Sequence, residues 1–319
     1  MGEISGYDIL KTSYQSRHWK TRLFASMVKR SHERQDILME QDKSDNIARL
    51  KETILREYPR LSSTDKFKFE CGPHLDCFND CCADVNIFLT PYDVLRMRKE
   101  LKMGSSKFLH DYAIIPFDDK QTLPVPLMLM EETDKKQCHF VDDEKGCTIY
   151  NNRPWPCRMY PLGMASPSEM VKEDSSKFFF LLNEDHCHGH KSDKEWTVEE
   201  WIADQGIEPY DEFGELFKVL TIHDRLRSGW KPTPKHVEIY WMGLYDLDKF
   251  RKMIFESSFL DRYEIPDDEI ATVKTDDEAL LRLGFRWVSM ALFGERSIPI
   301  RNEEDQKARL EAKILKKSD

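Results

Sequence analysis

The spacing of apolar residues predicts helices near the N-terminus of the chain. Ile47, Leu50 and Ile54 recur at helical intervals after Ser44, a residue type that often caps helices. We therefore expect residues 1–66 to form a helical region.

A second helical region is expected at residues 191–300, where Thr197 and Glu200 have the spacing of a capping box. Aromatic and aliphatic residues at helical spacing are typical of helices packed against a core. Three such stretches contain Phe213, Leu216, Phe217 and Leu220, then Val237, Tyr240, Trp241 and Leu244, then Leu280, Gly284, Trp287, Val288 and Ala291. Residues 301–319 are mostly charged, which predicts a frayed helix or a tail.

The pattern changes at residues 67–190, where short apolar runs alternate with turn residues. Thr90 followed by Pro91 has the pattern of a helix start, because threonine caps helices and proline is favoured at the first helical position. This predicts a helix from Pro91 to about Leu101.

Short strands are also predicted in this middle segment. They are expected at residues 125–131, 138–141, 147–150 and 177–182, with a turn at 142–146. The whole pattern predicts an α+β fold that is mostly helical, with a small irregular cysteine-rich core of short strands between helical N- and C-terminal regions.

Composition narrows the class of protein. The 319 residues are 40% hydrophobic and 11% aromatic, which is enough for a packed core. With 33% charged residues, a mean hydropathy of -0.63 and no apolar run near the roughly 20 residues that span a bilayer, we expect no membrane partner. Glu3 and Asp8 stand where a secretory signal has basic residues, so a cytoplasmic location is expected.

The net charge of -10 at pH 7 argues against nucleic acid as a partner, because phosphate binding depends on lysine and arginine. Basic residues are frequent between Lys11 and Arg34, and we interpret them as a solvated helix face. The sequence neither indicates nor excludes a protein partner.

The cysteines carry the clearest chemical signal, because all of them lie in the middle segment. They are Cys71, Cys77, Cys81, Cys82, Cys138, Cys147, Cys157 and Cys187. A disulfide framework is not expected in a reducing compartment, and the redox spacing Cys-x-x-Cys is absent from the sequence. Thiolates are soft ligands suited to zinc and to iron–sulfur clusters, so all eight are candidate metal ligands.

The spacing of the first four cysteines bears on which metal they bind. Structural zinc modules usually supply Cys-x2-4-Cys pairs, whereas the only such interval in the run Cys71-x5-Cys77-x3-Cys81-Cys82 precedes Cys81. We therefore favour an iron–sulfur cluster over zinc. Adjacent side chains such as those of Cys81 and Cys82 tend to point apart, so one of the two could bind a second metal. One metal site and two metal sites are therefore open alternatives.

Other residues near the cysteines are candidates for the same site. Arg153 and Arg158 flank Cys157 and could offset the negative charge of a thiolate-bound cluster, and with Tyr160 they are candidate cofactor contacts. Histidines also lie beside cysteines in the sequence, at His139, His186, His188 and His190. One ligand or hydrogen-bond donor among the three that surround Cys187 is an open alternative.

At these residues the chain resembles the YkgJ-type cysteine-cluster family, which is described as zinc- or iron-chelating. The shared motifs are Cys81-Cys82, Leu89-Thr90-Pro91-Tyr92-Asp93, Cys138, Gly146-Cys147-Thr148-Ile149-Tyr150 and Arg153-Pro154-Trp155-Pro156-Cys157-Arg158-Met159-Tyr160-Pro161. Family members often begin with Cys-x2-Cys-x2-Cys-Cys, whereas the gaps in this chain are five and three. The resemblance implies metal binding for about residues 67–190.

The resemblance leaves the reaction open. The leading interpretation is a cytoplasmic protein that holds or senses a metal ion or cluster. A related cysteine box in flagellin lysine methylases suggests a metalloenzyme as the alternative, which predicts a pocket beside the metal lined by Arg153, Arg158 and Tyr160. A third interpretation is an interaction module stapled by zinc.

Overall fold

The computed structural model describes residues 60–116, 122–165 and 178–301. The predicted helical stripe before residue 60 and nearly all of the predicted tail lie outside these residues. Within them the fold is the predicted one, mostly helical with small strand pairs in an irregular cysteine-bearing part.

The strands of the described residues form short antiparallel pairs. They are β1 (Lys66–Lys68) with β8 (Glu195–Thr197), β2 (Ala113–Ile114) with β3 (Leu127–Met128), β4 (Val141–Asp142) with β5 (Gly146–Cys147), and β6 (Leu162–Ala165) with β7 (Phe178–Leu181). The strand predicted at 177–182 matches β7, whereas that predicted at 125–131 is shorter. Pro124 and Pro126 provide no N–H for a ladder, which limits pairing before β3.

Short helices fill the rest of the cysteine-bearing part. They are α4 (Pro91–Glu100), α5 (Ser105–Tyr112) and α6 (Trp155–Met159), with 3₁₀ turns η1 (Asp80–Cys82), η2 (Tyr150–Asn152) and η3 (His188–Lys191). Helix α4 starts as predicted: Thr90 caps it, Asp93 completes a capping box and Pro91 is its first residue.

The C-terminal helices include all three predicted amphipathic stretches, which fall in α8, α10 and α14. The elements are α7 (Val198–Asp204), α8 (Glu208–Thr221), α9 (Asp224–Arg227), α10 (Pro234–Leu244), α11 (Leu247–Glu256), α12 (Phe259–Arg262), α13 (Asp267–Val273) and α14 (Asp277–Phe293). Helix α14 packs closely against α10 at Gly284. A Cβ at this position would lie 2.1 Å from the carbonyl oxygen of Gly243. No helix of the described residues has both the length and the apolar character needed to cross a bilayer.

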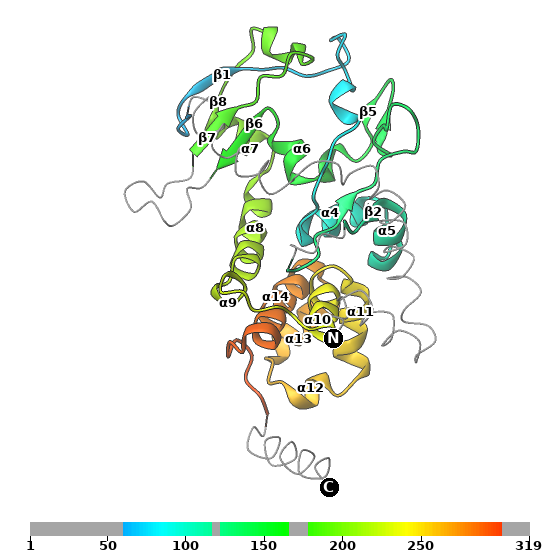
Figure 1. Ribbon diagram of the computed structural model, residues 1–319, viewed down its shortest axis with the longest axis vertical. Helices are drawn as coiled ribbons and strands as arrows, with labels where there is room; N and C mark the ends of the chain where they lie inside the picture. The colour runs from blue at the N-terminus through cyan, green and yellow to red at the C-terminus, as the bar shows by residue number, and fades with distance from the viewer. Residues whose placement is uncertain (1–59, 117–121, 166–177, 302–319) are drawn as a thin grey trace, which may run out of the picture.

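The two larger hydrophobic cores of the described residues both extend into the cysteine-bearing part. The large core joins α4 and α5 to the C-terminal helices, with the Tyr92 ring stacked on Phe213 at 4.3 Å. The small core lies under β1, β6, β8 and α7 and consists of Phe67, Phe69, Met159, Leu162, Val198, Trp201 and Ile207. Figure 1 shows β1, β6, β8 and α7 at one end of the molecule and α10 to α14 at the other, with α8 running between them. Trp155 of α6 packs against both cores.

Candidate metal centre

We call four cysteines the outer group: Cys71, Cys77, Cys81 and Cys187, the last of which packs against the small core. The loop between β1 and η1 runs along the segment that starts η3. Glu70 N–H donates to the Gly189 carbonyl at 3.1 Å, and His188 N–H donates to the Cys77 sulfur at 3.2 Å. These contacts bring the beginning of the cysteine box next to Cys187, more than 100 positions further along the chain.

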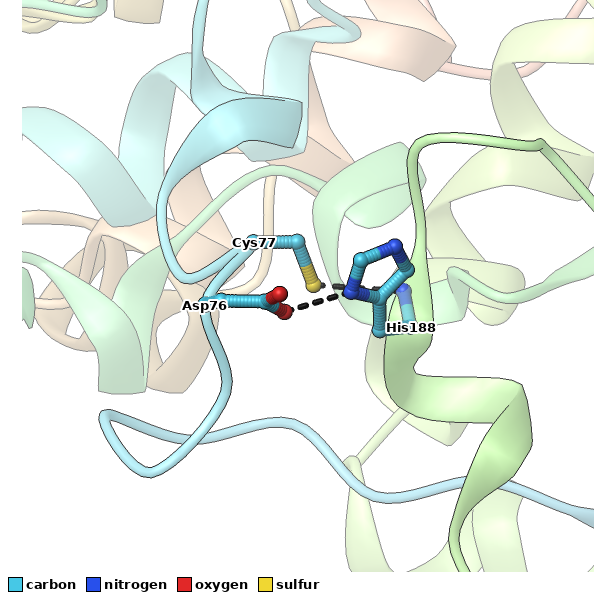
Figure 2. A group of neighbouring side chains, drawn as sticks. All are labelled: Asp76, Cys77 and His188. Carbon is cyan, nitrogen blue, oxygen red and sulfur yellow. Dashed lines mark hydrogen bonds and ion pairs between the residues drawn. The ribbon is translucent and has the colours of Figure 1, made fainter.

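Asp76 and His188 extend this group with ligands other than sulfur. The ligand atoms of Asp76, Cys77 and His188 all lie within 4.8 Å of one another, a spacing compatible with one metal ion. Figure 2 shows the Cys77 sulfur and the Asp76 carboxylate both directed at His188. A hydrogen bond between the His188 ring and Asp76 lowers the pKa of that carboxyl group. Sequence reasoning missed Asp76, although it directly precedes a predicted ligand.

The outer thiols influence one another electrostatically. Cys71 is a surface residue, yet desolvation by surrounding groups and the charges of the three other outer thiols raise the pKa of its thiol to about 11. Repulsion of this kind means that the thiolates are costly to form together unless a cation neutralises them.

The other four cysteines, which we call the inner group, are Cys82, Cys138, Cys147 and Cys157. Cys138 N–H donates to the Cys82 carbonyl at 2.8 Å, and Val141, three residues further on, pairs with Cys147 in the β4–β5 hairpin. Cys157 comes from α6. All four residues are partly buried, and Cys138 and Cys147 pack against the large core.

Burial dominates the acidity of the inner thiols. Burial, followed by the neighbouring charges of Cys138 and Cys147, raises the pKa of Cys157 to about 12. Burial and the charge of Cys147 likewise raise the pKa of Cys138 to about 11. A set of mutually repelling, desolvated thiols is the donor chemistry that suits a bound metal.

The two groups meet at Cys81 and Cys82. Their thiols hydrogen-bond to each other, which lowers the pKa of Cys81 to about 7 and raises that of Cys82.

Comparison with known proteins agrees with this picture. Residues 70–188 match the model of the CxxCxxCC family, whose description is "Putative zinc- or iron-chelating domain". We call residues 70–188 the CxxCxxCC domain, after the family model that they match. No curated protein and no solved structure matches the chain significantly.

The match confirms the predicted family and supports a metal-binding role for the CxxCxxCC domain. The helices from α7 onward lie outside it. All eight cysteines lie in the described residues and none of them forms a disulfide there, so every predicted ligand retains its thiol.

The start of α6 positions Cys157 through contacts with α4 and α8. The Asp93 carboxylate accepts the backbone N–H of Trp155 at 2.8 Å, and the indole N–H donates to Asp211 at 2.8 Å. The motifs around Asp93 and Cys157, far apart in the sequence, are thereby joined directly. Burial raises the pKa of Asp93, and its hydrogen bonds partly offset that effect.

Arg153 and Arg158 are buried beside the inner group, but their donors are engaged by the protein. Arg153 contacts the carbonyl oxygens of Tyr150 and Cys157 and the amide of Gln205. Arg158 contacts the carbonyls of Asn151, Arg153 and Gln205. Both charges still act on the Cys147 thiol, where they counter the rise in pKa caused by burial. Gln205, at the end of α7, had no local sequence signal.

Tyr160 lies near the outer group instead. Burial and the adjacent Cys187 thiol raise the pKa of its hydroxyl. The Phe69 ring contacts both Tyr160 and His190, at 5.9 and 5.3 Å between ring centres. Both ring nitrogens of His190 are buried and lack a hydrogen-bond partner among the described residues. Unpartnered polar atoms beside clustered thiols fit a domain that encloses a further group.

The structure also locates two surface hollows. One is lined by α7 and α8 residues such as Ile202 and Glu212, and the other by residues between Glu264 and Arg301. Arg153, Arg158 and Tyr160 line neither hollow, so the pocket expected for a metalloenzyme stays a prediction.

Proposed function

We propose that the CxxCxxCC domain holds its metal as an iron–sulfur centre bound by cysteine thiolates, in a protein of the reducing cytoplasm. We choose iron over zinc because of the segments of the chain that supply the ligands. The inner thiols come from separate segments, η1, the Cys138 bridge, β5 and α6. A structural zinc ion usually takes ligand pairs from a tight knuckle, whereas a larger cluster suits ligands that arrive from several directions.

Charge supports the same proposal. Thiolates leave a cluster site negatively charged, and the buried cations of Arg153 and Arg158 lie close enough to act on Cys147. We propose that they stabilise the loaded centre through charge while clamping the η2–α6 segment. Tyr160 would act on the other side, through its hydroxyl beside Cys187. An iron–sulfur centre would supply electron storage or transfer.

The state of the thiols supports the proposed cytoplasmic location. The eight cysteines are free, and so many neighbouring thiols persist in a reducing compartment.

Anaerobic purification tests the proposal by iron, sulfide and zinc analysis and visible absorption on one sample. We expect about four irons with matching sulfide for each cubane-type cluster, and a brown colour. The variant Cys157→Ser should lose iron, while Ser228→Ala, an exposed position in the helical region, should keep it. Zinc without iron would contradict the iron–sulfur assignment and leave metal binding intact, and a metal-free protein would contradict both.

A further inference from the structure

Two separate sets of contacts connect the segments that carry the cysteines. In the outer group, the loop before η1 pairs with the start of η3 through Glu70, Cys77 and His188. In the inner group, the residue after η1 pairs across to Gln137, and the chain then returns through the β4–β5 hairpin. The first set depends on the small core and the second on the large core, because Cys187 packs against one and Cys138 and Cys147 against the other.

The thiol neighbours divide in the same way. Cys71 interacts with Cys77, Cys81 and Cys187, all of the outer group. Cys157 interacts with Cys138 and Cys147, both of the inner group. Cys82 is adjacent to Cys138 and Cys157, and its contact with Cys81 is the point where the groups touch.

We infer that the domain contains two metal centres, an outer one bound by Cys71, Cys77, Cys81 and Cys187 and an inner one bound by Cys82, Cys138, Cys147 and Cys157. Each group has the four thiolates that complete either a zinc site or a common iron–sulfur cluster. The inference rests on the proposed function only in that the domain binds metal, and it holds for zinc as well as for iron.

The adjacent residues Cys81 and Cys82 make this inference sharply testable. The variants Cys81→Ser and Cys82→Ser have the same chemistry at neighbouring positions, so each is the matched control for the other. Each should retain about half of the metal of the full-length wild-type protein, since one of two equivalent four-thiolate sites loses a ligand.

Alkylation with iodoacetamide, followed by mass spectrometry, identifies the centre that was lost. Cys81→Ser should expose Cys71, Cys77 and Cys187 to the reagent and leave the inner thiols protected by metal. Cys82→Ser should expose the inner thiols and protect the outer ones. If both variants expose the same cysteines, or if either loses all of the metal while it stays folded, the two-centre inference is wrong.

Partial chelation of the wild-type protein provides the measurement that does not depend on a variant folding. Native mass spectrometry should detect a half-loaded species, in which alkylation marks one group only. Passage directly from loaded to empty protein would overturn the inference. A wild-type protein that binds no metal would refute the proposed function itself, so the two failures are distinguishable.

Discussion

The outer and inner cysteine groups have the same ligand chemistry in different surroundings. Cys71 and Cys81 of the outer group are exposed, and Asp76 and His188 add polar contacts beside Cys77. The inner cysteines are all partly buried, Cys138 and Cys147 pack against the large core, and two buried arginines lie beside the group. The difference teaches that the surroundings of each thiol, through burial, hydrogen bonds and neighbouring charges, determine how easily it loses its proton and how readily a reagent reaches it, although the ligand type is the same.

The largest expected difference concerns how metal affinity depends on pH. A thiol must lose its proton to bind metal, so affinity rises with pH wherever the thiol pKa lies above the solution pH. The pKa values of Cys138 and Cys157 are about 11 and 12, and those of Cys82 and Cys147 are also raised. Between pH 6 and 8, zinc affinity of the inner group should therefore rise by about 10,000-fold per pH unit, or tenfold per thiol.

The outer group should show a shallower slope, because Cys81 has a pKa of about 7 and is already partly ionised in that range. Zinc competition titrations measure the two slopes on Cys157→Ser, which leaves the outer group complete and keeps the Cys82 thiol that lowers the pKa of Cys81, and on Cys81→Ser, which leaves the inner group complete. Equal slopes would show that the two groups do not differ in proton cost.

The next difference is in the reactivity of the metal-free protein. Thiolates react with iodoacetamide and thiols do not, so Cys81, exposed and with a pKa of about 7, should be alkylated first at neutral pH. Cys157, partly buried and with a pKa of about 12, should react more slowly by on the order of 100-fold or more. Time-resolved peptide mapping measures both rates. In denaturant the two should react alike, and a preference that survives unfolding would contradict the structural explanation.

A smaller effect is expected from a glycine that supports the outer group alone. A Cβ on Gly189 would lie 2.7 Å from the Glu70 carbonyl oxygen, a backbone atom that cannot move aside easily. Gly189→Ala should therefore lower the free energy of unfolding by roughly 1–3 kcal/mol and weaken outer metal binding while the inner group keeps its metal. Denaturant titration and differential alkylation measure the two effects.

Gly214→Ala is the matched control, because nothing lies within 4 Å of a Cβ at that position in α8. Replacing a glycine within a helix should stabilise the protein by about 0.5–1 kcal/mol without changing metal content. A Gly189→Ala protein as stable as this control would show that the loop and η3 need not approach closely.

Local sequence signals predicted the start of α4 well, because its cap, its proline and its capping box lie within four positions of one another. The candidate ligands could also be predicted from the sequence, because a cluster of cysteines indicates metal binding through residue type alone. Their division into two groups could not be predicted from the sequence, because it depends on contacts between distant segments, such as that of Glu70 with Gly189. Gln205, which contacts both Arg153 and Arg158, escaped prediction for the same reason.

The smallest expected difference is between variants of two threonines that cap their helices in the same way. Thr90 accepts the N–H of Asp93 at 3.2 Å, and Thr197 accepts the N–H of Glu200 at 3.1 Å. Thr90→Ala and Thr197→Ala should each lower the free energy of unfolding by about 1 kcal/mol. Only Thr90 also donates to the carboxylate that holds Trp155, the first residue of the helix that carries Cys157. Thr90→Ala should therefore also weaken zinc binding by the inner group.

The pair of variants separates stability from metal binding because the two losses of stability are matched. Thr197 caps α7 beside the small core and has no contact with α6 among its hydrogen bonds in the described residues. Denaturant titration should give similar midpoints for the two variants, while zinc competition at the inner group should distinguish them. If both variants weaken the inner group equally, the effect follows from general loss of stability, and the link from Thr90 through Asp93 to Cys157 is not what positions that ligand.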